Sequence, residues 1–329
     1  MIWLPLALGY LLGSFLPAYF LTKWITGIDV RTVGTHHAGT TNVYRVAGFA
    51  PAMVTAVYDL LKGILAVSIS DSLGYPQWVS YLSGLCAILG HVFPFYLSFR
   101  GGKGAATTVG LLLVSLWKLG RWILLRDLIL DLLVLLLLVL VFLYTARKGD
   151  VIGIFVLPAL ALLMALRIEF SKVWFMDILI SILLLINLRN ISELRLVKFK
   201  EDVCAWRIYI RPVSLALFCL SFFMSRSGFL TLTGTLLLIF IIPDVIRLTN
   251  ERVQRFFHKK ITFKIYKDEE KSKISSMSLF LLGVFVTFLL FEKKIAFLST
   301  VFLAFGDLAA KVVGMSFGKK KLFEKTIEG

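Results

Sequence analysis

Long apolar runs recur along the whole chain, and this feature constrains the possible folds more than any other. Hydrophobic residues make up 58% of the 329 residues. Several runs approach the ~20 residues that a helix needs to cross a bilayer. Inside a bilayer the backbone has no water to bond, so segments of this length must satisfy their own N–H and C=O groups as helices. The sequence therefore predicts an all-α, polytopic integral membrane protein.

The apolar runs predict a seven-helix membrane domain followed by about four further transmembrane helices. The first seven are expected over residues 3–22, 52–70, 78–98, 105–117, 122–144, 151–168 and 172–188. The remaining four are expected over residues 213–224, 229–243, 276–291 and 295–305. The polar segments change near residue 205 from Gly, Thr and Asn motifs to Lys-rich sequence. We therefore predict two domains, 1–204 and 205–329.

Most of the Lys and Arg residues fall between alternate helices, which sets the orientation of the chain. Cytoplasmic loops are rich in these residues, so the basic segments are placed on the cytoplasmic face. These segments are 23–51, 99–104, 145–150, 189–212, 244–275 and 306–329. A net charge of +16 on such loops fits anionic lipids or anionic substrates. Nucleic acid is not expected as a partner, because no soluble basic domain is present to bind it.

The first basic loop, residues 27–48, is rich in small and hydroxyl-bearing residues. Backbone N–H, hydroxyl, amide and guanidinium groups are good donors to a phosphate or a polyol. The candidate donors are Thr35, Gly39, Thr41, Asn42 and Arg45. A solvated turn without a ligand is the alternative. The adjacent His36 and His37 lack a partner at metal-ligand spacing, so no metal site is expected in this domain.

The second candidate is the sequence RGGKG at 100–104, directly before an apolar run. Glycine allows the backbone to turn its N–H groups toward a ligand, and the start of a helix adds a positive dipole end. Arg100, Gly101, Gly102, Lys103 and Gly104 are therefore expected to form a small phosphate nest at the membrane surface. A tight turn whose charges anchor the membrane face is the alternative.

Two further polar groups accompany these loops. Asp59 and Lys62 lie three residues apart in an apolar helix and so face the same side, either toward a site or as a structural ion pair. His91 either points toward the same site or is a buried, hydrogen-bonded residue. Arg189 and Asn190 lie where the seventh helix returns to the cytoplasmic face. Together these residues offer phosphate binding, which suits a reaction that aligns an already activated substrate.

The motifs GTHHAGTTNVYR at 34–45, DLLKG at 59–63 and GHVFPFYLSFRGGKGAATTVG at 90–110 resemble the bacterial acyl-phosphate:glycerol-3-phosphate acyltransferase (PlsY) family. The resemblance covers about residues 1–202. It implies acyl transfer from acyl phosphate to the sn-1 hydroxyl of glycerol 3-phosphate, giving lysophosphatidic acid for phospholipid synthesis in the cytoplasmic membrane. No cofactor is implied for this step.

The resemblance also implies roles for individual residues. Thr35, Asn42, Arg45 and Lys103 are expected in catalysis, with the two cations on phosphates and the two polar side chains orienting groups. Substrate contacts are expected from Gly39, Thr41, Lys62, His91, Arg100, Gly101, Gly102, Gly104, Arg189 and Asn190. This sequence departs from the family where His36 and His37 replace Gly and Asn, and where the third motif has lost its His and displaced its Arg.

The end of the chain, residues 305–329, resembles the signature of CTP-dependent polyprenol, phytol and diacylglycerol kinases. The resemblance implies that Asp307 holds Mg²⁺ and that Lys319, Lys321 and Lys325 face the phosphates of CTP or the lipid. The domain is expected to be incomplete, with a separate chain completing it. The alternatives to an acyltransferase are therefore a CTP-dependent lipid kinase, an inactive scaffold with altered motifs, or, less favoured, a transporter.

Overall fold

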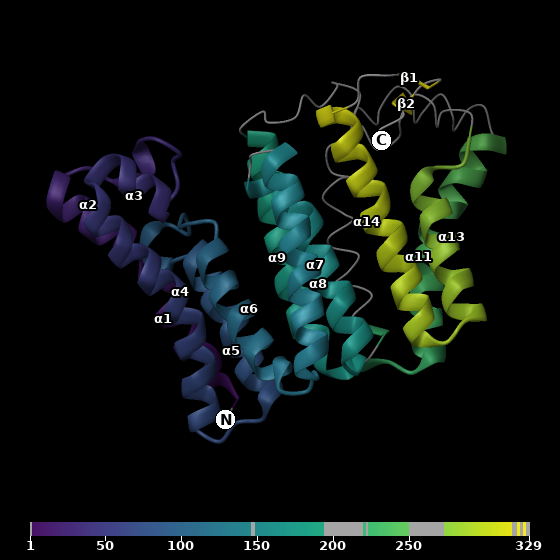
Figure 1. The fold of residues 1–329 in the computed structure, drawn as a ribbon, viewed down its shortest axis with the longest axis horizontal. Coiled ribbons are helices and arrows are strands. Elements are labelled where there is room, and N and C mark those ends of the chain that lie inside the picture. Colours follow the sequence, from purple (N-terminus) through teal and green to yellow (C-terminus); the bar gives the residue numbers. More distant parts are fainter. Residues whose placement is uncertain are drawn as a thin grey trace. The chain divides into compact units, whose positions relative to one another are not determined.

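The computed structural model describes residues 2–145, 149–193, 220–221, 223–249, 273–317, 321–322 and 325–326. Its elements are helices apart from one pair of two-residue strands, which confirms the prediction of an all-α fold (Figure 1). The chain divides into two compact units, Met1–Trp122 and Ile123–Gly329. The domain boundary predicted at 204/205 lies outside the described residues and stays a prediction.

The first unit holds the first two basic motifs on short helices and turns between longer helices. Its elements are α1 (Trp3–Ser14), α2 (Pro17–Thr26), the 3₁₀ helix η1 (Val30–Thr32), α3 (Thr40–Ala47), α4 (Phe49–Ser72), α5 (Gln77–Val92), the 3₁₀ helix η2 (Phe95–Leu97) and α6 (Ala105–Gly120). The sequence had predicted α4 and α6 closely, but it had extended α5 to residue 98, whereas α5 ends at Val92 and η2 follows. It had also predicted a loop where α3 and η1 form.

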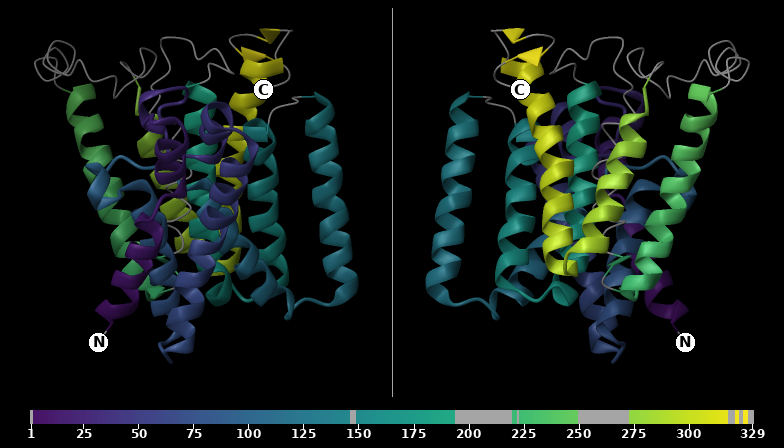
Figure 2. Two further views of the ribbon diagram at one scale, coloured as in Figure 1. Left: turned by 90° about the vertical axis from the view of Figure 1, so that its left-hand side faces the viewer. Right: turned by 90° about the vertical axis from the view of Figure 1, so that its right-hand side faces the viewer.

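The second unit consists mainly of long helices. They are α7 (Leu125–Thr145), α8 (Gly149–Arg167), α9 (Phe170–Glu193), α11 (Arg226–Thr249), α13 (Ser276–Leu290) and α14 (Lys293–Phe317), followed by the antiparallel strands β1 (Lys321–Leu322) and β2 (Lys325–Thr326). Within this unit α8 packs against both α7 and α9, and α13 packs against both α11 and α14. Figure 2 shows α7 at one edge of the unit.

Five segments among the described residues are long and apolar enough to cross a membrane. They are Trp3–Thr26, Phe49–Ser72, Gln77–Leu97, Lys172–Ile191 and Arg226–Thr249. The helices α6, α8 and α13 are also apolar but shorter. The expected helix over 213–224 falls mostly outside the described residues.

Several helices run past the ends that the sequence had predicted. An apolar run predicts that a helix crosses the bilayer but does not fix the residue at which the helix ends. The helix α9 continues to Glu193 and includes Arg189 and Asn190, which had been expected in a loop. In the same way α14 extends to Phe317, so the backbone of Asp307 is helical.

The first apolar run is broken, which corrects the expectation of one helix over 3–22. The helix α1 ends at Ser14, and Phe15 has an extended backbone with φ −65° and ψ 121°. Pro17 then begins α2. Proline suits the first position of a helix because its missing N–H has no partner to lose there, but it cannot continue the hydrogen-bond ladder of the preceding helix.

The backbone groups at this break are satisfied by tyrosines of other helices and turns. The Tyr96 hydroxyl donates to the Ser14 carbonyl at 2.7 Å, and it accepts from the Leu16 N–H at 3.2 Å. The Tyr58 hydroxyl donates to the Leu12 carbonyl at 3.1 Å. Irregular backbone at membrane depth is tolerated where protein groups replace water in this way. The break therefore ties the N-terminal helices to α4 and to the turn after α5.

Glycines bring the helices of the first unit close together. A Cβ atom at Gly9 or Gly13 of α1 would clash with backbone carbonyls of α5, and one at Gly90 of α5 would clash with the backbone of α1. Gly110 of α6 meets the carbonyl of Leu60 on α4 in the same way. Small residues of this kind allow close packing of membrane helices. This packing fixes the ends of α4, α5 and α6, from which the polar motifs project.

Candidate active site

The first loop is shaped by the buried amide of Asn42, at the start of α3. Its nitrogen donates to the carbonyls of Val30, Val33 and His37 at 2.6, 3.0 and 3.1 Å. Its oxygen accepts from the N–H of Thr35 at 3.1 Å. These contacts use both N–H groups of the amide and one lone pair of its oxygen. Asn42 therefore organises the loop, and a direct contact with substrate stays a prediction.

The other candidate residues of this loop surround that amide. Thr35 and Thr41 are exposed, and Gly39 is half-buried at the N-cap of α3. Arg45 lies in the last turn of α3 and is also exposed. Arg45 makes no ion pair or side-chain hydrogen bond with any residue that the structure describes. Its guanidinium is therefore available to an anion outside the protein core.

The second loop, residues 98–104, does not present all of its N–H groups as the nest prediction required. The N–H of Gly101 donates to the Val92 carbonyl at 3.0 Å, and that of Gly102 donates to the His91 carbonyl at 3.1 Å. Both N–H groups thus bind carbonyls at the C-terminal end of α5. This corrects the expectation that these two glycines turn their N–H groups to a ligand. Their small size matters instead, because a Cβ at either position would clash with residues at the end of α5.

A helix was predicted to begin directly after the glycine-rich sequence, and α6 does begin there. Gly104 has φ +83°, a left-handed value that favours glycine, and α6 begins at the next residue. No side chain caps this helix among the described residues. Lys103 is half-buried immediately before this turn, and Arg100 is exposed. An uncapped helix N-terminus with two nearby cations favours an anion.

The two loops lie against each other. The Ala38 N–H faces the Gly101 carbonyl at 3.5 Å, and the Ala38 carbonyl lies so close to Gly102 that a Cβ there would contact it. Arg31 joins the loops more firmly, because its Nη1 donates to the Leu97 carbonyl at 2.9 Å and to the Arg100 carbonyl at 3.1 Å. Through these contacts the two loops, which are about 60 residues apart in the sequence, form one surface.

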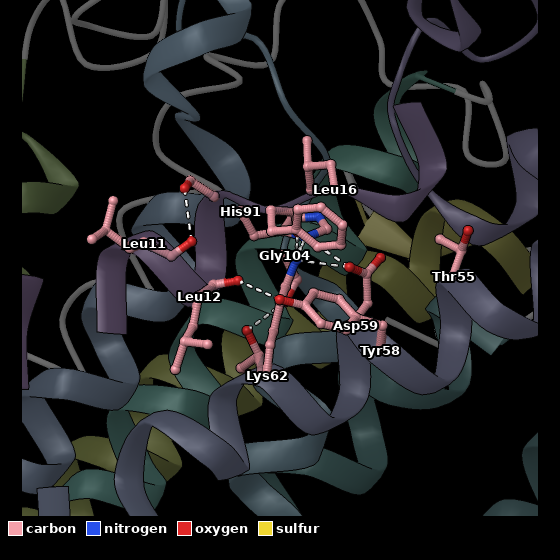
Figure 3. Close-up of polar contacts among 12 residues, drawn as sticks. Leu11, Leu12, Leu16, Thr55, Tyr58, Asp59, Lys62, His91 and Gly104 are labelled. Atoms are coloured by element: carbon pink, nitrogen blue, oxygen red, sulfur yellow. Dashed lines mark hydrogen bonds and ion pairs between the residues drawn. The ribbon is translucent and has the colours of Figure 1, made fainter. Parts of the chain in front are cut away.

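A buried layer of charge lies at the base of these loops (Figure 3). Lys62 is fully buried, and its Nζ lies 2.7 Å from the Asp59 carboxylate and 2.6 Å from His91 Nδ1. The Phe15 carbonyl, at the break between α1 and α2, lies 3.5 Å from the same Nζ. The predicted ion pair of Asp59 and Lys62 is confirmed, and His91 completes it. An ammonium has three protons, and these three protein groups provide one partner for each of them.

His91 links this buried layer to the second loop. Its imidazole is 3% exposed, and its Nε2 side lies against Gly102. The sequence had left open whether His91 faces the site or is a buried, hydrogen-bonded residue. The structure shows the buried arrangement, in which the ring packs directly below the loop that carries Lys103. The predicted substrate contacts of Lys62 and His91 stay predictions.

Sequence reasoning missed Asp29 and Arg31. The Arg31 guanidinium binds the Asp29 carboxylate through Nη2 at 2.7 Å and through Nε at 3.0 and 3.2 Å. These bonds hold the pKa of the Asp29 carboxyl below its usual value and raise the pKa of Arg31. The spacing Asp-x-Arg before a turn was the available signal, because an Asp that caps a 3₁₀ turn can also reach a cation two residues later.

The remaining candidates belong to the second unit. Asn190 on α9 donates to the Asp150 carboxylate of α8 at 2.8 Å, and Arg189 is its neighbour on the same helix. Lys319 lies outside the described residues. The backbones of Asp307, Lys321 and Lys325 are described, but their side chains are not. In the described part of the chain, no three His, Cys, Asp or Glu side chains group as metal ligands would.

Comparison with known proteins identifies the family of this chain. The profile of the glycerol-3-phosphate acyltransferase family matches residues 3–197, more than half of the chain. The chain belongs to the glycerol-3-phosphate acyltransferase family. The family match spans the two loops, the buried layer and α9, so it includes every candidate residue of the predicted acyltransferase domain. It does not reach the lysine-rich C-terminal segment.

Individual family members are similar over shorter segments. The glycerol-3-phosphate acyltransferase of a Synechococcus species is 45% identical over 117 residues, which cover 36% of this chain and 58% of that protein. The Pseudomonas putida enzyme is 40% identical over 129 residues, which cover 38% and 68%. The chain thus spans little more than half the length of the first curated relatives it matches. The crystal structure of PlsY (YgiH) in its glycerol 3-phosphate form is 28% identical, with a TM-score of 0.46, and covers 59% of this chain and 92% of that one.

Proposed function

We propose that this protein transfers an acyl group from acyl phosphate to the sn-1 hydroxyl of glycerol 3-phosphate. The product is lysophosphatidic acid, a precursor of phospholipids. The main support is the meeting of two cation-bearing loops at an uncapped helix N-terminus in a chain of this family. Both proposed substrates carry a phosphate, and such a surface suits two anions held close together.

The proposed reaction needs alignment more than a protein nucleophile. Acyl phosphate is a mixed anhydride with a good leaving group. The hydroxyl oxygen of glycerol 3-phosphate attacks the acyl carbon, the new ester C–O bond forms, and the bond from the acyl carbon to the phosphate oxygen breaks. The hydroxyl proton passes to a phosphate oxygen of the substrates, and inorganic phosphate leaves. Arg45 and Lys103 hold the phosphates, Thr35 orients a polar group, and the loop shaped by Asn42 keeps them in place.

The deciding experiment uses the purified full chain in detergent or vesicles. Palmitoyl phosphate and labelled glycerol 3-phosphate are supplied, and the lipid product is identified by mass spectrometry. We expect lysophosphatidic acid, and we expect none when palmitoyl-CoA replaces palmitoyl phosphate. Product from acyl-CoA alone would contradict the proposed donor. Absence of product with either donor, from folded protein, would contradict the function and favour the inactive scaffold.

We also propose that the two loops face the cytoplasm, where glycerol 3-phosphate is dissolved. The excess of Lys and Arg in these segments supports this orientation. The test places single cysteines at Thr35 and, as a control, at Tyr75 in the turn between α4 and α5 of a protein without native cysteines. In intact cells an impermeant maleimide should label the second and spare the first. The reverse pattern would overturn the orientation.

For residues 205–329 the CTP-dependent lipid kinase remains a separate proposal, supported by the C-terminal signature alone. Asp307 would hold Mg²⁺, and Lys319, Lys321 and Lys325 would meet phosphates. The test is CTP-dependent phosphorylation of diacylglycerol, undecaprenol or phytol by this chain. Absence of activity would contradict a kinase role without affecting acyl transfer.

A further inference from the structure

We propose that the Asp29–Arg31 pair is a positioning unit that holds the 98–104 loop against the first loop. The proposal rests on the proposed function, because that loop carries Lys103 and leads into α6. Both residues precede the motif at 34–45 on which the family resemblance rested. Their role is therefore carried by geometry and not by a motif.

Arg31 contacts the second loop at two backbone carbonyls that flank its sharpest turn. Nη1 donates to the carbonyl of Leu97 at 2.9 Å and to that of Arg100 at 3.1 Å. Charge-assisted hydrogen bonds of this kind are about twice as strong as neutral ones. Ser98 and Phe99 form this turn, and the Phe99 N–H donates to the Pro94 carbonyl at 3.1 Å. One guanidinium thus binds the carbonyls on both sides of Ser98 and Phe99.

The turn needs such a contact because its backbone is unfavourable. Ser98 and Phe99 have φ of +53° and +58°, in the left-handed region that glycine adopts most easily. Two adjacent non-glycine residues in that region persist only where the surroundings hold them. Without Arg31 the strain at Ser98 and Phe99 would favour relaxation of the turn toward ordinary, negative φ values. That relaxation would shift Arg100 and the glycines that follow it.

The opposite side of the guanidinium is fixed by Asp29 and Tyr19. The carboxylate accepts three hydrogen bonds from Nε and Nη2, and it also caps the N–H of Arg31 itself at 2.9 Å. The face of the guanidinium lies 5.2 Å from the Tyr19 ring centroid on α2. The side chain of Arg31 is 21% exposed. Its nitrogens are therefore directed at protein groups, and Arg31 positions the loop instead of binding an anion, unlike Arg45.

The kinetic test compares Arg31→Lys with a control, Lys23→Ala. Lysine keeps the charge but lacks the planar fork that joins a carboxylate to two carbonyls. We expect kcat to fall about 10- to 100-fold, because small misplacements of catalytic groups have effects of that size. KM for glycerol 3-phosphate should change less, since the cations that attract it remain. Lys23→Ala removes a neighbouring charge that contacts Tyr19 at 3.1 Å, and it should leave both parameters near wild type.

A second test reads the loop directly and needs no enzymatic activity. Trypsin cleaves after Arg100 only when the loop opens, and its rate follows the open population. We expect Arg31→Lys to raise the rate of cleavage after Arg100 by about tenfold or more, as the loss of bonds to a charged group would predict. Asp29→Asn keeps an acceptor for Arg31 but loses the charge, and it should give a smaller rise. It also serves if Arg31→Lys fails to fold.

The outcomes separate the two proposals. Faster cleavage together with lower kcat supports the positioning role. Lower kcat with unchanged cleavage overturns it, because Arg31 would then act through its charge or by touching substrate. Wild-type kinetics and cleavage in both variants overturn it as well. Faster cleavage in a chain whose wild type makes no lysophosphatidic acid supports the clamp and rejects the acyltransferase.

Discussion

Cations on the exposed surface of the first unit and the cation in the layer buried below it differ in their hydrogen-bond partners. On the surface Arg45 and Arg100 have no side-chain partner among the described residues and face solvent. Below it Lys62 is saturated by a carboxylate, an imidazole and a carbonyl. Folding therefore leaves the donors of some motif cations free for an anion, as in Arg45, and bonds those of others within the protein, as in Lys62.

Removing one member of the buried pair should have the largest effect. Lys62→Met leaves the Asp59 carboxylate buried beside an imidazole only, and breaking a buried pair costs about 3–5 kcal/mol of stability. The double variant Asp59→Leu with Lys62→Met removes both charges and should recover most of that loss. Unfolding in a denaturant series checks both. A double variant as unstable as the single one would mean that the pair is needed for more than its mutual charge.

The pair of Lys118 and Asp71 is a matched control for this comparison. It has the same N–O distance of 2.7 Å, but its side chains are 20% and 38% exposed. Exposed pairs contribute about 0–1 kcal/mol. Lys118→Met should therefore be close to wild type in stability, and an equal loss in both lysine variants would refute the argument from burial.

Lys103 lies between the surface and the buried layer, and its removal should affect catalysis more than stability. Lys103→Ala should cost about 2–4 kcal/mol of transition-state stabilisation, as the loss of a preorganised charge contact does. The rate of lysophosphatidic acid formation measures this loss. Protein yield and unfolding should stay near wild type, and Lys23→Ala should retain the rate. Near-normal turnover of Lys103→Ala would remove this residue from the site.

Gly102 is the contact between the two layers. Gly102→Ala places a Cβ against His91 Nε2 and the Ala38 carbonyl, so we expect a loss of about 1–3 kcal/mol in stability from overpacking. Gly120→Ala, at the end of the helix that follows, meets nothing within 4 Å and should be neutral or stabilising. Thermal unfolding of the two variants is the measurement. Equal midpoints would show that the loop and the imidazole are not in firm contact.

The smallest effect concerns the surface pair Asp29–Arg31, which is about one quarter exposed. The pKa of Asp29 is lowered in the folded protein, chiefly by its hydrogen bonds to Arg31 and also by nearby Lys23. Its contribution is therefore complete above the unfolded pKa of about 3.9 and is lost as the pH falls through the lower folded pKa. Wild type should exceed Asp29→Asn in unfolding midpoint near neutral pH, and the difference should close in acid. A difference that persists at low pH would contradict the charge-based explanation.

The sequence predicted the long helices of the first unit well because their apolar runs end at polar motifs. It placed the start of α6 at residue 105 and paired Asp59 with Lys62 correctly, since both follow from local spacing. It missed the break after Ser14, although Pro17 was visible. The break requires hydroxyls from Tyr58 and Tyr96, and only the folded chain brings those to it.

The sequence predicted which loops form the candidate site, but it did not predict which of their polar groups bind other protein groups. A motif cannot distinguish a donor directed at substrate from one directed at the protein backbone. Asn42 and the N–H of Gly102 turned out to be of the second kind. Arg31 lies 66 positions from Leu97, so its contact with that carbonyl follows from tertiary packing and not from any local pattern.

The break between α1 and α2 also bears on how this sequence can change over generations. Pro17 frees backbone groups that Tyr58 and Tyr96 then satisfy from distant positions. Loss of either hydroxyl alone leaves a polar group stranded, while replacement of the proline alone leaves the hydroxyls without their acceptors. We therefore expect these three positions to be inherited together. A lineage that straightens its first helix should replace the tyrosines by phenylalanine or another apolar residue.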